Sequence, residues 1–288
     1  MSPVLVATTP DDESVPLGPV LSIFDPVHIG IDEFGHPVQV PMIYRNMLIG
    51  GEPGAGKSAL LNAVVAHAAL SLDCRLCLLD GKQVELGQWR HCADAFVGPS
   101  LDGALGLLRR LAVMMDRRYA YLLDCERRKV VADDKSMSAY LMAIDEIAYF
   151  SATAGKKPER EEFASLLRDL VARGRAVGII VVAATQRPSS DIIPTSLRDL
   201  FAWRFAGRCT TDSSSDIVLG HGWAQQGWTA NTISPTNPGA GLLIAEGGSP
   251  QLVKVAYLDD GTCAAIAGYA ATLRDTVAAK RRRLQAAA

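Results

Sequence analysis

The sequence predicts an α/β fold with a mostly parallel sheet that has helices on both faces. A glycine-rich segment at 51–58 lies between an apolar strand pattern and a helical pattern, so it joins a strand to a helix. Further strand and helix patterns alternate along the chain, which is the order that builds a parallel sheet. One of these strands, at 178–185, is apolar throughout, as expected of a strand covered on both faces.

Each expected element has its own pattern in the sequence. Short apolar runs between turn residues predict strands, and apolar residues spaced three and four positions apart predict helices. The expected strands are 46–50, 74–80, 140–145, 178–185, 202–208, 241–245 and 251–257. The expected helices are 57–71, 103–128, and a helix after 145 that carries Phe163, Leu166, Leu167, Leu170 and Val171.

The two ends of the chain differ from this centre. Residues 1–24 are rich in proline and acids and are expected to form a flexible leader. Residues 27–45 alternate apolar and polar side chains around Gly35, which predicts an N-terminal β-hairpin extension beside the sheet. We therefore expect one central domain at 25–260 and a basic C-terminal helix at 261–288.

The composition limits the classes of function. The 288 residues carry a formal net charge of −2, so contacts with nucleic acid or anionic membranes must come from local patches. Six cysteines without a secretory leader indicate a reducing, cytoplasmic environment, and no apolar run approaches the ~20 residues of a membrane span. Cys74 and Cys77 are expected on opposite faces of one strand, which argues against a shared metal or disulfide.

The glycine-rich segment fits the phosphate-binding pattern G-x-x-x-x-G-K-[ST] at every fixed position. It consists of Gly51, Glu52, Pro53, Gly54, Ala55, Gly56, Lys57 and Ser58. Glycines allow backbone N–H groups to point at phosphate oxygens, and the start of the following helix adds positive potential. Lys57 is then expected to reach the β- and γ-phosphates of ATP, and Ser58 to bind Mg2+. The segment predicts a P-loop NTPase.

An acidic pair follows the strand at 140–145, where α/β sheets place chemical groups. Asp145 is expected to hold Mg2+, and the adjacent Glu146 to polarise the attacking water. Kinases of this loop class do not need the second acid, so the pair favours ATP hydrolysis over transfer to another acceptor. Thr185 and Gln186 end the next strand and are expected at the same edge, near the γ-phosphate.

Two segments, 78–89 and 144–192, resemble the motor domain of the FtsK/SpoIIIE/HerA superfamily of double-stranded DNA translocases. The most specific parts are the glycine loop, the acidic pair and the run 185–188. The resemblance covers roughly residues 27–258 and implies a RecA-like ATPase motor that acts as a hexameric ring on duplex DNA. The soluble TraB/TraSA-type conjugative transfer proteins of actinomycetes look most similar. This implies a role in conjugative plasmid transfer or in DNA segregation.

The resemblance also implies roles for arginines. Arg204 falls on a family arginine and is the first candidate to serve the ATP of a neighbouring subunit, with Arg208 second. The family's Asp-Ser-Arg run after the sensor segment is absent here, because Ser214-Ser215-Asp216 occupies that place. Either arginine is equally consistent with a surface charge on a strand edge.

DNA contact is expected from basic residues in loops. The expected contacts are Lys156, Lys157 and Arg160, in a polar loop after the acidic pair, with Arg187 and the cluster 280–283 as further candidates. Such residues contact phosphates, so they bind DNA without reading its sequence, although a solvated surface explains them equally well.

Two other functions remain open. One is a protein-translocating ATPase module of a type VII-like secretion system, and the other is a regulator whose ATP binding controls assembly. A membrane-anchoring partner protein is also possible.

Overall fold

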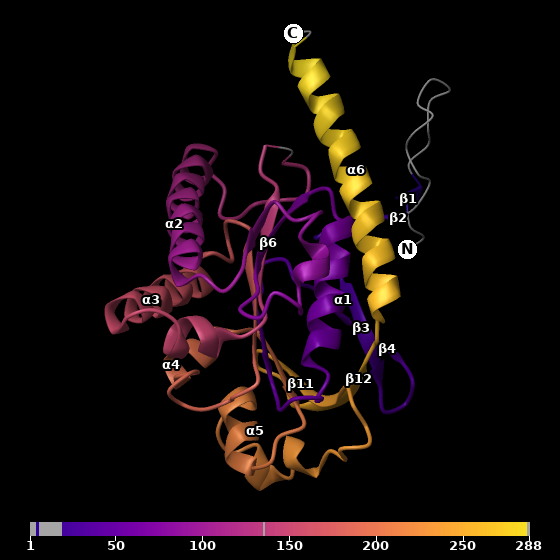
Figure 1. Cartoon of the computed structure of the whole chain (residues 1–288), viewed down its shortest axis with the longest axis vertical. Coiled ribbons are helices and arrows are strands. Elements are labelled where there is room, and N and C mark those ends of the chain that lie inside the picture. The colour runs from indigo at the N-terminus through magenta and orange to yellow at the C-terminus, as the bar shows by residue number, and fades with distance from the viewer. Residues whose placement is uncertain (1–3, 6–18, 135, 287–288) are drawn as a thin grey trace.

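The computed structural model describes residues 4–5, 19–134 and 136–286, with residues 4–5 and 278–286 as backbone only. One mixed sheet of ten strands forms its centre (Figure 1). In spatial order the strands are β4 (Pro37–Val40), β3 (Val27–Asp32), β12 (Gln251–Val255), β11 (Ala240–Ala245), β10 (Trp203–Gly207), β5 (Met47–Gly50), β9 (Ile179–Thr185), β8 (Ala139–Ile144), β6 (Cys74–Leu79) and β7 (Ala95–Val97). A separate short pair joins β1 (Val4–Leu5) to β2 (Pro19–Val20).

The sheet has a parallel half and an antiparallel half. All neighbours from β10 through β5, β9, β8 and β6 to β7 pair in parallel. From β10 outward, β11, β12, β3 and β4 pair antiparallel, and the outermost pair is the predicted N-terminal hairpin. The strand that leads into the glycine loop, β5, is therefore central and lies next to β9, which separates it from β8.

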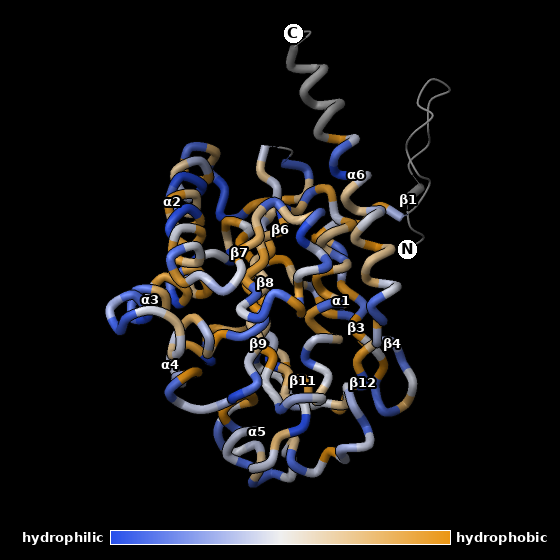
Figure 2. The backbone as a smooth tube through the Cα atoms, in the orientation of Figure 1, coloured by the Kyte–Doolittle hydropathy of each residue, from blue (hydrophilic) through white to orange (hydrophobic). Residues whose placement is uncertain are grey.

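Helices cover both faces of the sheet, which confirms the predicted fold class (Figure 1). The helices are α1 (Lys57–Leu70), α2 (Leu101–Asp124), α3 (Lys157–Arg173), α4 (Thr195–Arg198), α5 (Asp212–Leu219) and α6 (Asp260–Ala286). The helices α1 and α6 pack on one face, and α2, α3 and α5 pack on the other. Figure 2 shows hydrophobic residues concentrated along the strands between these layers.

Side chains of β6 show how the two cores are separated. Cys74 belongs to the core under α1 and α6, whereas Cys77 belongs to the core under α2 and α3. The two residues therefore face opposite sides of the sheet, as their spacing predicts, and both are free thiols.

The last residues of the expected flexible leader, 21–24, are folded in the structure. Ile23 is fully buried in the core, and its backbone N–H donates to the Asp73 carboxylate at 3.0 Å. The backbone N–H of Leu21 donates to the carbonyl oxygen of Leu70 at 3.1 Å, at the end of α1. Residues 21–24 are therefore part of the folded unit, because Ile23 is buried in the core and Leu21 and Phe24 pack against the same core.

No helix in the described part of the chain combines the length and the apolar character that crossing a membrane requires. The side chains of the basic cluster 280–283 lie outside the described residues, so its predicted DNA contact stays a prediction. The backbone there is helical as part of α6, in line with the C-terminal helix expected from the sequence.

Candidate nucleotide site

The glycine loop joins β5 to α1 at the carboxyl edge of the parallel strands. Gly54 and Gly56 have φ of 78° and 91°, in the left-handed region that favours glycine. A Cβ atom on Gly56 would lie 2.3 Å from the Cα of Gly239, so no larger residue fits. The first turn of α1 has no side-chain cap and no acidic residue. Its N–H groups are therefore available to an anion.

Lys57 is the cation of this loop. Its side chain is buried, and its Nζ donates to the carbonyl oxygen of Glu52 at 2.6 Å. Burial lowers the pKa of Lys57 from 10.5 to about 8, and the negative charges of Glu146 and Glu85 partly oppose this shift. A buried ammonium with only a backbone partner is well suited to bind phosphate oxygens.

Asp145 follows β8 and faces the same edge. One carboxylate oxygen, Oδ1, accepts the Gly81 N–H at 2.9 Å, while Oδ2 is buried without a hydrogen-bond partner among the described residues. Burial, reinforced by the negative charge of Asp80, raises the pKa of Asp145 to about 7. An unpaired buried carboxylate oxygen is costly unless a ligand satisfies it, and Mg2+ with its water shell is a suitable ligand.

Glu146 is held by the end of the neighbouring strand. Its Oε1 accepts the Thr185 hydroxyl at 2.7 Å, and its Oε2 accepts the Gln186 N–H at 2.8 Å. Thr185 is fully buried, whereas Glu146 is partly exposed, so the hydrogen bond joins the core to the surface of the site. The sequence predicted that Thr185 and Gln186 would lie near the phosphates. In the structure they also fix the carboxylate expected to polarise water.

The predicted residues converge because β5, β9 and β8 are adjacent and parallel, so their carboxyl ends meet. A small cavity forms between them. It is lined by Lys57, Ser58, Leu61, Lys82, Glu85, Asp145, Ala184 and Gln186. No cluster of three or more His, Cys, Asp or Glu side chains suited to a metal occurs in the described part of the chain. A metal here would rely on Ser58, Asp145, water and phosphate oxygens, which is a donor set that suits Mg2+.

Sequence reasoning missed two of these residues, Lys82 and Glu85. The Ser58 hydroxyl donates to Glu85 Oε2 at 2.6 Å, and Lys82 Nζ lies 3.7 Å from Glu85 Oε1. Both residues belong to the segment after β6 that resembles the family, so the signal was present. Their proximity to Ser58 depends on how this loop folds over α1, which the spacing does not show.

The two candidate arginines have different surroundings. Arg208 contacts the glycine loop of its own chain, because its Nη1 lies 3.0 Å from Glu52 Oε2 and its carbonyl oxygen accepts the Glu52 N–H. Arg204 is largely buried, 3.8 Å from Asp199, and its Nε has no partner among the described residues. Burial lowers the pKa of the Arg204 guanidinium.

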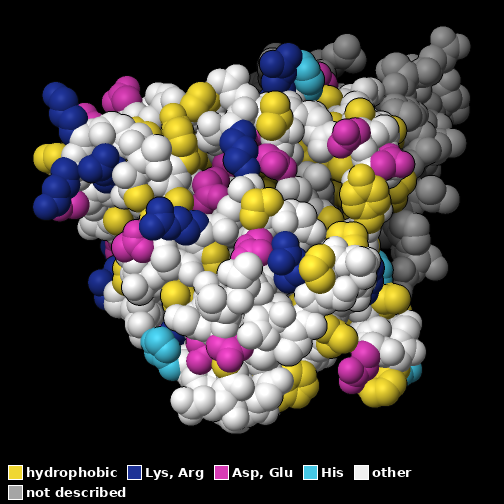
Figure 3. Space-filling model, turned by 60° about the horizontal axis from the view of Figure 1, so that its bottom comes forward, with side chains coloured by type: hydrophobic (Ala, Val, Ile, Leu, Met, Phe, Trp, Pro, Cys, Tyr) yellow, Lys and Arg dark blue, Asp and Glu magenta, His cyan; other side chains and the backbone are white. Residues whose placement is uncertain are grey.

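The basic residues expected to meet DNA lie apart from this cavity. Lys157 begins α3, so the expected loop is shorter than predicted: the Lys156 N–H donates to Glu159 Oε2 at 2.7 Å and caps the helix. Lys156 and Lys157 are exposed, and the Arg160 side chain donates to the Gly155 carbonyl oxygen at 3.1 Å. Figure 3 brings the α5 side of the molecule forward and shows basic side chains interspersed with acidic ones.

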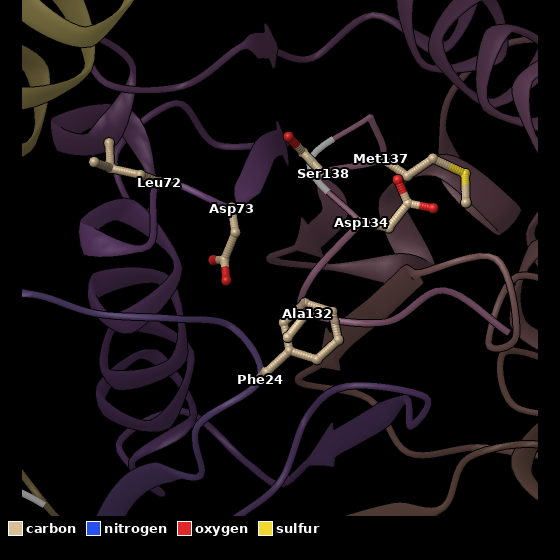
Figure 4. Close-up of a pocket in the computed structure, with 7 residues that line it drawn as sticks. All are labelled: Phe24, Leu72, Asp73, Ala132, Asp134, Met137 and Ser138. Atoms are coloured by element: carbon tan, nitrogen blue, oxygen red, sulfur yellow. The ribbon is translucent and has the colours of Figure 1, made fainter.

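A second hollow lies at the opposite edge of the sheet, where β6 and β8 begin. Figure 4 shows the residues that line it, which are Phe24, Leu72, Asp73, Ala132, Asp134, Met137 and Ser138. Both of its acids are already engaged: Asp73 accepts the Ser22 hydroxyl, and Asp134 lies 2.8 Å from the Arg127 guanidinium. This hollow therefore offers no free charged group for chemistry.

Comparisons with known proteins agree with the geometry of the site. The family model described as FtsK/SpoIIIE family matches residues 15–152. A protein named DNA translocase FtsK from Chlorobaculum tepidum is 30% identical in an alignment of 201 residues that covers 63% of this chain. Over these residues the chain is similar to the FtsK/SpoIIIE family. Protein Tra from Streptomyces lividans is also 30% identical to this chain, in an alignment of 227 residues that covers 74% of the chain.

Comparison with solved structures supports the fold described above. The structure described as the pCW3 conjugation coupling protein TcpA, monomer form with ATPgS, superposes with a TM-score of 0.75 over 92% of this chain and 73% of that one. The identity is 21%, so this likeness concerns the fold alone. The chain spans only 24% of the FtsK relative and 36% of the Tra relative.

Proposed function

We propose that this chain is the ATP-hydrolysing motor of a machine that moves double-stranded DNA. The observation that carries the proposal is the convergence of Lys57, Ser58, Asp145 and Glu146 at one edge of a parallel sheet. Two relatives that are 30% identical, named DNA translocase FtsK and Protein Tra, support DNA as the substrate. We further propose that the setting is conjugative transfer or DNA segregation.

Each residue of the site has a distinct task in this proposal. The N–H groups of the loop and the Lys57 ammonium bind and orient the phosphates of ATP. Ser58 and Asp145 would hold Mg2+, which would supply positive charge beside the phosphates. Glu146 accepts a proton from the attacking water and so makes it a better nucleophile. A chain with these groups hydrolyses ATP and does not need a second acceptor.

The hydrogen bonds of the site suggest how hydrolysis is coupled to movement. The Lys57 ammonium donates to the Glu52 carbonyl oxygen, and the Glu146 carboxylate accepts hydrogen bonds from Thr185 and Gln186. ATP binding draws Lys57 toward the phosphates, and water activation requires Glu146 to release part of its contact with β9. Because Gln186 begins the loop that leads to α4, a change at Glu146 is transmitted to that loop. We propose this connection as the route from chemistry to DNA movement.

Assembly into a ring, proposed here as hexameric, completes the site. Among the described residues, the cavity lining includes Lys57 and Lys82 but no arginine. An arginine at the transferring phosphate accelerates phosphoryl transfer about 10³-fold or more. Arg204 of a neighbouring subunit is the candidate, because Arg208 is occupied by Glu52 of its own chain.

If a neighbouring subunit supplies this arginine, turnover per subunit should rise with protein concentration. Arg204→Ala should abolish hydrolysis and spare ATP binding. Turnover that is constant while sedimentation shows monomers becoming rings would contradict the shared site.

The proposal is tested by the steady-state ATPase rate with and without duplex DNA of random sequence. We expect DNA to raise the rate several-fold, and Glu146→Gln to abolish both the basal and the stimulated rate. A protein-translocating ATPase of the type VII class would hydrolyse ATP without responding to duplex DNA. A regulator would bind ATP with little turnover in either condition. Either result would overturn the proposal.

A further inference from the structure

The segment after β6 forms a fixed wall of the nucleotide cavity. The buried Asp80 accepts N–H groups of Lys82, Gln83 and Leu86 at 3.0, 2.7 and 2.8 Å. These bonds close the loop onto itself at the carboxyl end of β6. The loop is therefore preorganised, and its side chains hold defined positions beside α1.

A second anchor ties this loop to the helix that carries Ser58. Trp89 is fully buried, and its Nε1 donates to Asn62 Oδ1 on α1 at 2.9 Å. Leu86, one residue after Glu85, is also fully buried. The backbone at Glu85 is thus held on both sides, which places its side chain beside the exposed Ser58 on α1.

The Ser58 hydroxyl has one proton to donate and two lone pairs to offer. Its proton goes to Glu85 Oε2 at 2.6 Å, so the lone pairs remain free for a metal. The other carboxylate of the cavity, Asp145, instead accepts the Gly81 N–H and keeps Oδ2 unpaired. The contact between Ser58 and Glu85 is therefore compatible with a metal on Ser58.

We infer that Glu85 is a positioning residue for the Mg2+–nucleotide complex, and that it acts by orienting the Ser58 hydroxyl toward the metal. This inference rests on the proposed function, since it requires an ATP site with Mg2+. The Glu85 charge also stabilises a cation nearby through space. Lys82, 3.7 Å from Glu85, limits the negative charge of the cavity when no metal is bound.

The test measures binding and does not depend on turnover. A fluorescent, non-hydrolysable ATP analogue is titrated in EDTA and then at increasing Mg2+, to give the metal-free affinity and the half-saturating Mg2+ concentration. Loss of a group that orients a metal ligand typically weakens metal affinity about 10- to 100-fold. Glu85→Gln should therefore raise the half-saturating Mg2+ about tenfold or more and leave the EDTA affinity within about twofold. Glu85→Ala should act in the same direction.

Two further variants separate a specific role from a general one. Glu162→Gln, on the exposed face of α3 where Glu162 pairs with Arg109, changes the same chemical group away from the cavity and should match the wild type. In a Ser58→Ala background, Glu85→Gln should add less than about twofold, because residues that act through one contact are not additive. Full additivity would show that Glu85 does not act through Ser58 and would overturn the inference.

The remaining outcomes are equally distinct. An unchanged Mg2+ requirement in Glu85→Gln would overturn the inference alone. A lower requirement would also overturn it, since Glu85 would then compete with the metal for Ser58. Two results together would overturn the proposed function along with the inference. They are analogue binding by the wild type that does not depend on Mg2+, and an analogue affinity that Lys57→Ala leaves unchanged.

Discussion

The residues predicted to act on ATP lie at the carboxyl edge of the sheet, and the residues predicted to bind DNA lie at the start of α3. The two regions differ in how many of their contacts the chain makes with itself. At the edge, Lys57, Asp145 and Glu146 converge and hydrogen-bond within one chain. At α3, Lys156 and Lys157 face solvent. The hydrogen bonds that one chain makes alone are visible in its structure, whereas contacts with DNA or with another subunit need the partner. The two regions therefore require different measurements.

The largest expected effect is on nucleotide binding. Lys57→Ala removes the only lysine of the loop, so ATP affinity should fall about 100-fold or more, the scale for losing one partner of a buried charge contact. Isothermal titration with an ATP analogue measures it. Lys157→Ala, an equal change at the start of α3, should leave this affinity unaltered. Equal losses of ATP affinity in the two variants would contradict the assignment of nucleotide binding to Lys57.

The next effect separates binding from chemistry at the edge. Glu146→Gln keeps the shape of the side chain but cannot accept a proton from water. Hydrolysis should fall about 100-fold or more, as expected for lost general-base catalysis, while ATP still binds. The ATPase rate and the affinity for an ATP analogue, measured on the same variant, separate hydrolysis from binding. If the variant hydrolyses ATP like its parent, Glu146 only anchors the end of β9.

A moderate effect is expected at α3. Replacing both Lys156 and Lys157 with Ala should make the log–log dependence of duplex affinity on salt shallower by up to about two units, near 0.9 for each phosphate that is no longer neutralised. Fluorescence anisotropy across a salt series measures this slope. Nucleotide affinity without DNA should not change. An unaltered slope would show that these lysines are solvated surface residues.

The smallest effect concerns the stability of the nucleotide-free chain. Burial raises the Asp145 pKa from 3.8 to about 7, so between these values the folded chain holds a proton that the unfolded chain has lost. Stability therefore decreases as pH rises through this window. Asp145→Asn should raise the melting temperature by on the order of 5 °C at about pH 8 and hardly at about pH 4. Asp116→Asn, at an exposed acid on α2, is the control. A shift that is equal at both pH values would contradict the assignment.

Periodicity predicted the individual strands well, because a short apolar run between turn residues is a property of local sequence. The strands β5, β8 and β9 lie within a few residues of the expected runs, and their carboxyl ends bring Lys57, Asp145 and Gln186 together. The helix start at Lys157 was available from Pro158, which favours the first turn, and from Glu159, which caps it. The strand β7 and the helices α4 and α5 are too short for a period to be evident.

Other features depend on contacts that no local pattern contains. Glu85 meets Ser58 only because Asp80 closes the loop and Trp89 pins it to α1. Ile23 is buried because its segment packs against the core under α1 and its backbone N–H is bound by the Asp73 carboxylate, contacts that lie about fifty residues away along the chain. The hold of Thr185 on Glu146 depends on the pairing of β8 with β9. Such contacts require the three-dimensional arrangement of elements.

The central claim is that ATP hydrolysis drives this chain along duplex DNA, and triplex displacement tests it most directly. A fluorescent third strand is bound to one end of a long duplex, and its release is followed after ATP is added. The account predicts release by the wild type with ATP and Mg2+, and no release with ADP or with Glu146→Gln. A chain that binds the duplex and hydrolyses ATP, yet never displaces the third strand, would contradict it.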